Sequence, residues 1–220
     1  MGILETAGFT VVNYSYEDSN VSFYSNLPTH DYGLIVLRVH SAIVEGSDLL
    51  GLFTSEPYNS EMYPLLQNTH QLVKAFYTQG GPEFFAVAPG FIDYTMQGTF
   101  QNTIIVLMGC DGLKYTKMAE AFIRKGAKVC IGWNGLIDAQ STDTATSYLL
   151  ERLVTYRRNV NDAVNETMQY IGKAPVYNSS LRYFPTSVGN YTIPIQTGLT
   201  LNIAEITIFL TRETERINPI

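Results

Sequence analysis

Two apolar runs constrain the fold of this chain more than any other feature of its sequence. Residues 34–39 and 103–108 are rich in aliphatic and β-branched side chains, and each run leads into a turn. Short apolar runs bounded by turn signals are typical of strands that are buried on both faces. Such strands form mostly parallel sheets with helices on both sides, and so the sequence predicts an α/β fold.

One reactive side chain follows each run, His40 after the first and Cys110 after the second. Catalytic groups of open α/β sheets gather beyond the carboxyl ends of the strands. We therefore expect the imidazole and the thiol at one edge of the sheet, where a base and a nucleophile can carry out covalent acyl transfer. Taken alone, each residue has a structural alternative, a buried cysteine or a hydrogen-bonded histidine at a strand end.

The sequence around Cys110, Gly-Cys-Asp-Gly, predicts a sharp turn from a strand into a helix. A thiol directly before a helix lies near unpaired N–H groups and the positive end of the helix dipole, and both favour the thiolate. The same N–H groups can bind the oxyanion of a tetrahedral intermediate. The second cysteine, Cys130, is expected in the core, because two cysteines at strand positions imply no disulfide framework.

Composition narrows the classes of partner. The chain has 220 residues, 45% of them hydrophobic, and a net charge of −6. This length suits a single domain over residues 1–220 with a sizeable core. Basic residues are scattered, the densest group being Arg152, Arg157 and Arg158, and so we expect no nucleic-acid partner. No apolar run reaches the roughly 18 residues of a membrane span. Neither a metal nor a cofactor is expected, because no cluster has metal-ligand spacing and no glycine-rich phosphate loop occurs.

The sequence leaves cellular location and assembly open. It contains five Asn-x-Ser/Thr sites, at Asn13, Asn20, Asn165, Asn178 and Asn190. The amino terminus has no signal-peptide pattern. The sites indicate an exported domain whose targeting segment lies outside this chain, and chance occurrence in a cytoplasmic protein is the alternative. Nothing in the sequence indicates an oligomeric state.

Hydrophobic periodicity and capping signals predict the remaining elements. Helices are predicted over residues 2–7, 20–27, 65–77, 114–125, 141–157 and 160–171, and further strands over residues 9–14, 49–54, 84–88, 128–133 and 199–210. A chain that opens on the end of a helix suggests that an earlier strand is missing or differently arranged. Residues 45–101 look like an insertion with extra strands that shapes specificity or forms a lid. Residues 173–220 form a loop-rich tail with the final strand.

The stretch Met108–Trp133 carries a resemblance to a known family. It contains Gly-Cys-Asp-Gly-Leu, then Met-Ala-Glu-Ala-Phe, then Lys-Gly-Ala-Lys-Val-Cys-Ile-Gly-Trp. Together with the aliphatic block that ends in His40-Ser41, it resembles the caspase/gingipain/clostripain group of cysteine peptidases, and the CHAT-type caspase-like domains in particular. The resemblance covers roughly residues 30–170. The spacing of 70 residues between His40 and Cys110 is longer than in caspases, and the extra length lies in the insertion.

The resemblance implies a three-layer αβα sandwich around a mostly parallel sheet, and an endopeptidase that needs no cofactor. In that family the histidine, here His40, is general base and acid, and the cysteine, here Cys110, is the nucleophile. The oxyanion lies between the amide of the cysteine and the amide after the histidine, here that of Ser41, where the family more often has glycine. The substrate would be a peptide or protein.

Two alternatives stay open. The family includes members with degraded dyads, and so the chain could be a catalytically inactive binding or assembly module. It could also be an unrelated doubly wound ligand-binding domain with an incidental cysteine. That last alternative requires His40 and Cys110 to lie far apart.

Substrate preference is weakly encoded in the sequence. Trp133 and Asn134 follow a predicted strand and should line the cleft, although the tryptophan could instead pack against the end of the sheet. Asp111, Asp143 and Glu56 are acidic residues that could bind a basic substrate side chain, as carboxylates do in relatives that cleave after Arg or Lys. Helix capping is the competing role for Asp143.

Overall fold

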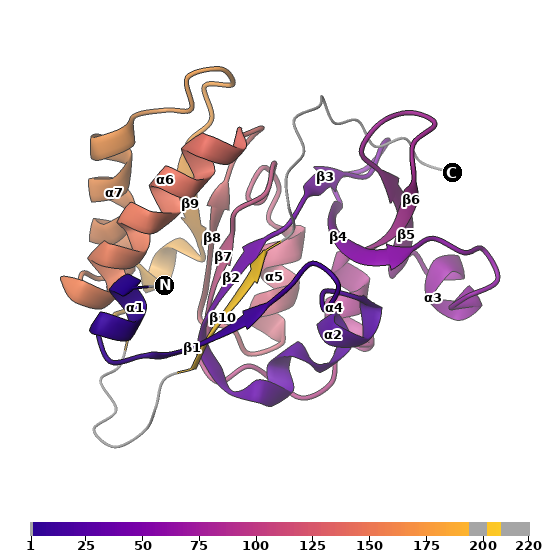
Figure 1. Ribbon diagram of the computed structural model, residues 1–220, viewed down its shortest axis with the longest axis horizontal. Coiled ribbons are helices and arrows are strands. Elements are labelled where there is room, and N and C mark those ends of the chain that lie inside the picture. The colour runs from indigo at the N-terminus through magenta and orange to yellow at the C-terminus, as the bar shows by residue number, and fades with distance from the viewer. Residues whose placement is uncertain (1, 194–201, 208–220) are drawn as a thin grey trace.

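The computed structural model describes residues 2–193 and 202–207 of the 220-residue chain, with side chains from Leu4 to Ile193. The fold is mixed α/β, with two sheets and helices packed around them (Figure 1). The larger sheet, sheet A, contains, in spatial order, β1 (Thr10–Tyr14), β10 (Asn202–Thr207), β2 (Tyr32–Arg38), β7 (Ile104–Leu107), β8 (Val129–Trp133) and β9 (Leu181–Phe184). The first five strands pair in parallel, and β9 is antiparallel to β8.

Helices cover both faces of sheet A (Figure 1). One face packs against α6 (Ala139–Leu150) and α7 (Val160–Ile171), and the short α1 (Gly2–Thr6) joins the same apolar cluster. The other face packs against α2 (Val21–Asn26), α4 (Pro89–Tyr94) and α5 (Lys117–Arg124). Alternate residues of a strand point to opposite faces. Leu34 of β2 accordingly enters one cluster and Ile35 the other, and this is why the run is apolar throughout.

The smaller sheet, sheet B, lies within and beside the predicted insertion. Its strands are antiparallel, in the order β3 (Ser41–Ile43), β4 (Leu50–Pro57), β6 (Glu83–Val87) and β5 (Leu72–Phe76). The strand β3 begins at the residue after His40, so the two sheets meet at the histidine. The two strands predicted in this segment, over 49–54 and 84–88, correspond to β4 and β6.

The prediction of one helix over residues 65–77 is wrong. The chain forms one short helix, α3 (Pro64–Asn68), leaves the helical conformation at His70 with a φ of 52°, and continues as β5. Cross-strand contacts with β6 decide the outcome, among them an ion pair of 2.9 Å between Lys74 and Glu83. The apolar spacing within residues 72–76 is compatible with a helix, and only the partner strand selects the extended form.

Two further helices differ from the prediction at their first residues. The helix α5 begins at Lys117 rather than at residue 114, because residues 111–116 form turns. Asp138, rather than Ser141 or Thr142, caps α6, and its carboxylate accepts the N–H of Ser141 at 2.8 Å. The predicted helix to residue 157 gives way after Leu150 to a π-helical turn, η2 (Glu151–Thr155).

The carboxyl-terminal half contains a confirmed cap and two further strands. Asn159 caps α7 as predicted, accepting the N–H of Asp162 at 2.8 Å. The strand β9 lies in the segment expected to be loop-rich. The predicted final strand is described over residues 202–207 as β10; residues 199–201 and 208–210 lie outside the described part of the chain.

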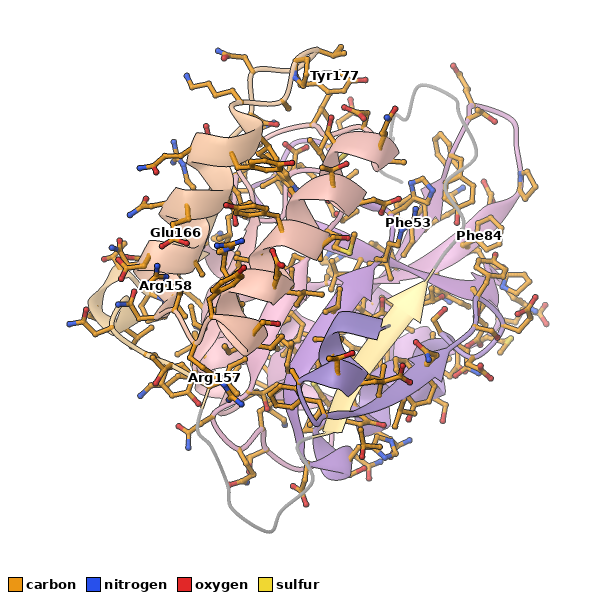
Figure 2. The ribbon with its side chains drawn as sticks, turned by 60° about the vertical axis from the view of Figure 1, so that its left-hand side comes forward. Phe53, Phe84, Arg157, Arg158, Glu166 and Tyr177 are labelled. Atoms are coloured by element: carbon orange, nitrogen blue, oxygen red, sulfur yellow. The ribbon has the colours of Figure 1, made fainter. Side chains whose placement is uncertain are left out.

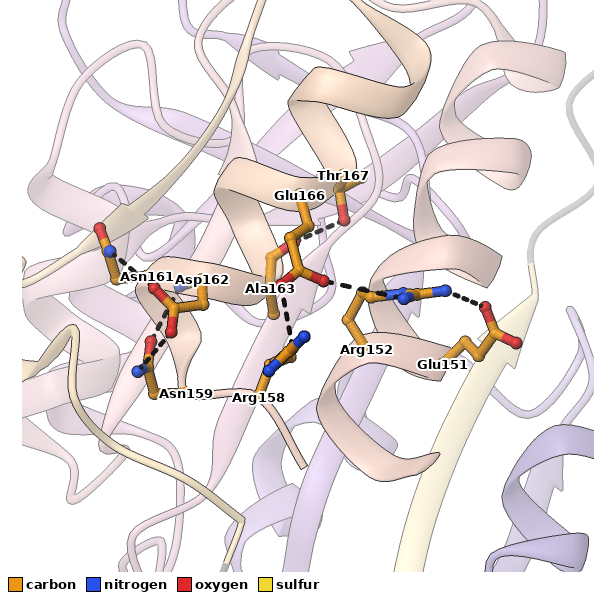
Figure 3. Close-up of polar contacts among 9 residues, drawn as sticks. All are labelled: Glu151, Arg152, Arg158, Asn159, Asn161, Asp162, Ala163, Glu166 and Thr167. Carbon is orange, nitrogen blue, oxygen red and sulfur yellow. Dashed lines mark hydrogen bonds and ion pairs between the residues drawn. The ribbon is translucent and has the colours of Figure 1, made fainter. Parts of the chain in front are cut away.

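Two of the three arginines in the densest basic group, Arg152 and Arg158, are paired with glutamates. Arg152 lies 2.9 Å from Glu151 and 3.8 Å from Glu166, and Arg158 lies 2.9 Å from the same Glu166 (Figure 3). These ion pairs tie η2 to α7. Among the described residues, no helix is both long enough and apolar enough to cross a membrane.

Candidate active site

The segments that carry His40 and Cys110 lie side by side at the carboxyl edge of sheet A. The strands β2 and β7 are parallel neighbours in which Leu37 pairs with Leu107. The ladder continues past the strands, since the N–H of Met108 donates to the carbonyl of Leu37 at 3.0 Å. This register carries the chain from both strands directly to the two reactive residues.

A hydrogen bond joins the two segments beyond the strand ends. The hydroxyl of Ser41, the residue after His40, donates to the carbonyl of Cys110 at 2.6 Å. Ser41 is buried, so this bond is shielded from water. Gly109 makes the approach possible, because a Cβ at this position would collide with the carbonyl of Val39 and with the side chain of Ser41.

Cys110 does not stand directly before a helix, and this expectation from the sequence is wrong. The chain turns at Asp111, which has a φ of 57°. The next residues form hydrogen-bonded turns, in which Lys114 donates to the carbonyl of Asp111 at 3.0 Å. The helix α5 begins only at Lys117. The dipole of α5 is therefore too distant to act as predicted, because the effect falls off within the first turn.

The backbone of the loop before α6 contacts the thiol instead. The sulfur of Cys110 lies 3.5 Å from both the backbone nitrogen and the carbonyl oxygen of Ile137. Ile137 immediately precedes Asp138, the N-cap of the 12-residue helix α6. The N–H of Ile137 is within reach of a hydrogen bond to the sulfur. The thiol alone would instead donate its hydrogen to the Ile137 carbonyl.

The loop that presents Ile137 is held from several sides. The N–H of Asp111 donates to the carbonyl of Gly135 at 2.9 Å. The side chain of Asn134 accepts the N–H of Ser180 at 2.7 Å, and the hydroxyl of Ser179 donates to the carbonyl of Leu136 at 2.6 Å. These bonds connect the turn after Cys110, the end of β8 and the start of β9. They hold the backbone of residues 134–137 in place beside the sulfur of Cys110.

His40 is enclosed by the aromatic side chains of sheet B. Its ring lies 4.6 Å from the ring of Tyr77 and 5.9 Å from that of Phe53, measured between centroids. Its carbonyl accepts the N–H of Phe53 at 2.9 Å. Only 4% of the residue is exposed, so its ring is packed rather than solvated. Phe53 and Phe84, labelled in Figure 2, belong to β4 and β6 of sheet B.

The amide of Ser41 points away from its neighbouring strand. Phe53 donates to His40, and Val44 donates to Leu49 at 2.8 Å, which fixes the phase of the β3–β4 ladder. Ser41 pairs with Leu52 between these positions, where the two residues do not exchange hydrogen bonds. The N–H of Ser41 is therefore directed to the side opposite β4.

Asp111 is a buried carboxylate next to Cys110. Its Oδ1 atom has no hydrogen-bond partner in the described structure, although the ammonium of Lys114 lies 3.5 Å away as an ion pair. Burial raises the pKa of Asp111 above its ordinary value, and Lys114 offsets part of that rise. A buried carboxylate with one distant partner costs stability in its charged form.

The other residues proposed from the sequence for substrate binding have structural partners. Trp133 is 1% exposed, and its indole N–H donates to the hydroxyl of Thr142 at 3.0 Å. Asp143 does not cap α6; it accepts two hydrogen bonds of 2.7 Å from Arg38. Trp133 therefore packs against the end of the sheet. Asp143 forms an ion pair with Arg38 and does not cap the helix.

Glu56 is hydrogen-bonded within the protein, and Cys130 lies in the core. Glu56 accepts the N–H of Val21, the first residue of α2, at 3.0 Å and the hydroxyl of Tyr63 at 2.8 Å. It therefore stabilises the start of that helix. Cys130 is fully buried, as predicted, and burial raises the pKa of its thiol. Cys130 is consequently an internal standard for an unreactive cysteine.

Three of the residues that hold the site together could not be identified from the sequence. Ile137, Ser179 and Tyr77 lie far from His40 or Cys110 in the sequence, and only the fold brings them close to these two residues. The Asn134-Gly135 pair is a turn signal after a predicted strand, and it could have indicated a loop at this edge. No family model, curated protein or solved structure matches the chain. Within residues 2–193 and 202–207, no group of three or more histidine, cysteine or acidic residues could hold a metal ion.

Proposed function

We propose that the protein is a cysteine endopeptidase of the caspase-like group that uses Cys110 and His40 as its catalytic dyad. The observation that carries the proposal is the hydrogen bond of 2.6 Å between Ser41 and Cys110, which joins the two reactive segments at one edge of a sheet. The intact dyad positions and the resemblance of residues 108–133 to CHAT-type domains add support.

The chemistry follows the usual course of a thiol acyl transfer. The thiolate of Cys110 attacks the scissile carbonyl carbon, and a carbon–sulfur bond forms. His40 donates a proton to the leaving amine as the peptide bond breaks, which leaves an acyl-enzyme. His40 then removes a proton from water, the hydroxide attacks the thioester, and the carboxylic acid leaves with release of Cys110.

The amide groups of Ser41 and Cys110 are the proposed donors to the oxyanion. Two preorganised N–H groups stabilise the negative charge that develops on the carbonyl oxygen. The outward direction of the Ser41 amide from the β3–β4 ladder suits this role. The bond from the Ser41 hydroxyl to Cys110 fixes the spacing between the two residues. Serine thus serves where relatives more often have glycine.

The proposed fold is the three-layer αβα sandwich of caspase-like proteins. The five parallel strands of sheet A and the helices on both of its faces accord with that architecture. The antiparallel sheet B would then be an addition particular to this chain. It occupies much of the insertion that lengthens the spacing between the histidine and the cysteine.

The substrate is a peptide or protein, and the residues beside the sulfur suggest how it is bound. Leu136 is 43% exposed although it is flanked by held backbone, and Val176 and Tyr177 in the neighbouring loop are also exposed. These side chains could contact apolar residues of a peptide. Asp111 is the acidic group nearest to Cys110 in sequence, and it is buried with the ammonium of Lys114 3.5 Å from its carboxylate.

Peptide cleavage and thiol labelling test the proposed function together. The wild-type protein should cleave members of a peptide library that varies basic, acidic and apolar residues, and Cys110→Ala should abolish cleavage. Iodoacetamide should label Cys110 in preference to Cys130, with Cys130→Ser as the control that leaves labelling unchanged. Labelling of Cys110 without cleavage of any peptide would favour the binding-module alternative. Labelling of Cys130 alone would refute the dyad.

A further inference from the structure

The imidazole of a catalytic histidine must be held in one orientation, and this chain has its own means to do so. The histidine lies between two strands: β2 ends at Arg38 and β3 begins at Ser41. Its backbone is therefore fixed on both sides. Two side-chain torsions remain to be fixed, and a displacement of about 1 Å at a reacting group can cost about 100-fold in rate.

Three rings form a stack that ends at His40. Tyr77 and Phe53 are stacked with centroids 5.1 Å apart and an interplanar angle of 17°. The imidazole packs against both, at 56° to each ring. Rings at these separations and angles attract one another through their quadrupoles as well as by burial. The stack therefore favours one position of the imidazole.

Sheet B holds Tyr77 in turn. The residue follows β5 directly, and its ring lies 5.3 Å from that of Phe84 on β6. Burial raises the pKa of Tyr16, and the side chain of Tyr77 offsets part of that rise. The small buried residues Ala75 and Ala86 complete the apolar cluster around Phe53. The ring of Tyr77 is thus held by its contacts with Phe53 on β4 and Phe84 on β6.

We propose that Tyr77 is a positioning residue for His40, and that sheet B is the support which orients the candidate base. The inference rests on the proposed function for its catalytic consequence. It gives the insertion a role other than that of a lid or a specificity loop. It also answers how the imidazole is oriented in a family in which no third residue is obligatory.

The test compares four variants. Tyr77→Ala removes the ring, Tyr77→Leu removes the ring but retains apolar volume, and Tyr77→Phe retains the ring without the hydroxyl. Tyr58→Ala is the matched control, because Tyr58 also packs on sheet B, with its ring 5.2 Å from Phe85, but makes no ring contact with His40. Urea unfolding of each variant identifies any loss that comes from the stability of the sheet alone.

The expected result separates orientation from substrate binding. Tyr77→Ala and Tyr77→Leu should lower kcat by about 10- to 100-fold with a smaller change in KM. Tyr77→Phe should stay within about threefold of wild type, because it preserves the ring packing. Tyr58→Ala should retain the wild-type kcat. Wild-type kcat in folded Tyr77→Leu, or an equal loss in Tyr58→Ala, would overturn the inference.

A second readout does not need peptidase activity. The rate of Cys110 alkylation by iodoacetamide is measured against pH for wild type, Tyr77→Leu and His40→Ala. The profile of Tyr77→Leu should move toward that of His40→Ala, and that of Tyr77→Phe should match wild type. The proton resonances of the His40 ring should lose their ring-current shift in Tyr77→Leu only. If no peptide is cleaved but these changes occur, the proposed function fails and the positioning role stands. Unchanged resonances and profile would refute the positioning role.

Discussion

At the scale of single residues, Gly109 and Ser41 determine how closely the two reactive segments approach. The absence of a side chain at Gly109 lets Val39 and Ser41 pack against the backbone before Cys110. The Ser41 hydroxyl then bonds to Cys110. Close packing of this kind tolerates neither an added atom nor the loss of the hydroxyl without a local shift.

The first prediction concerns the cost of an added methyl group at Gly109. Gly109→Ala should lower the free energy of unfolding by about 1–3 kcal/mol, because the new Cβ collides with the Val39 carbonyl and the Ser41 side chain. Urea denaturation measures the change. The control is Gly90→Ala in α4, where the added Cβ meets only Gln71 at an ordinary 3.4 Å. Equal stability of the two variants would contradict the predicted collision.

The second prediction concerns the pH dependence that Asp111 introduces. Burial raises the pKa of Asp111 in the folded protein above its unfolded value of about 4. The folded state therefore binds the proton more tightly, and this contribution to stability is full in acid and is lost as the pH rises through the folded pKa. Asp111→Asn, which also tolerates the positive φ, should remove that loss. Unfolding free energies at pH 4 and pH 7 measure it, and an identical pH dependence in both proteins would refute the assignment.

The sequence could predict the position of a residue where a local pattern determines it, and not where contacts between distant segments do. His40 and Cys110 stand at the ends of apolar runs, and the local pattern is enough to place them. Ile137 and Tyr77 reach the site through the packing of separate elements, and no local pattern encodes that. Trp133 and Asp143 lie near the expected edge, but their polar atoms are bound to Thr142 and Arg38.

At the scale of elements, long apolar runs were predictable and short strands were not. The parallel strands β2, β7 and β8 are buried on both faces, so their composition alone reveals them. The strands β5 and β9 are five and four residues long and depend on their partner strands for their conformation. Their apolar residues fit a helix or a loop equally well in the sequence, and tertiary pairing decides.

The third prediction tests the loop beside the sulfur. Asn134→Ala leaves the N–H of Ser180 without its side-chain acceptor and should lower the free energy of unfolding by about 1 kcal/mol. The loop should then present Ile137 less firmly to the sulfur, and alkylation of Cys110 should slow. Gln140→Ala, on the exposed side of α6, is the amide control and should change neither quantity. Faster alkylation in Asn134→Ala would mean that the loop shields the sulfur instead.

At the scale of the whole molecule, the order of the strands brings His40 and Cys110 to the same edge of sheet A. The strands β2 and β7 are central and adjacent in sheet A, so their carboxyl ends open at one place on the edge of the sheet. Sheet B starts at that same place and encloses the histidine from the other side. The sequence predicted the first arrangement from two apolar runs. It could not predict the second, because the strands of sheet B associate through contacts between distant residues.

The most direct test of the account is a double-mutant cycle on peptide cleavage. The cleavage rate of the best library substrate is measured for wild type, His40→Ala, Cys110→Ala and the double variant. Residues that act as one catalytic unit are strongly non-additive. Each single variant should fall to the same background rate, and the double variant should fall no further. A His40→Ala protein that keeps the wild-type rate would contradict the claim that the imidazole and the thiol work as a pair.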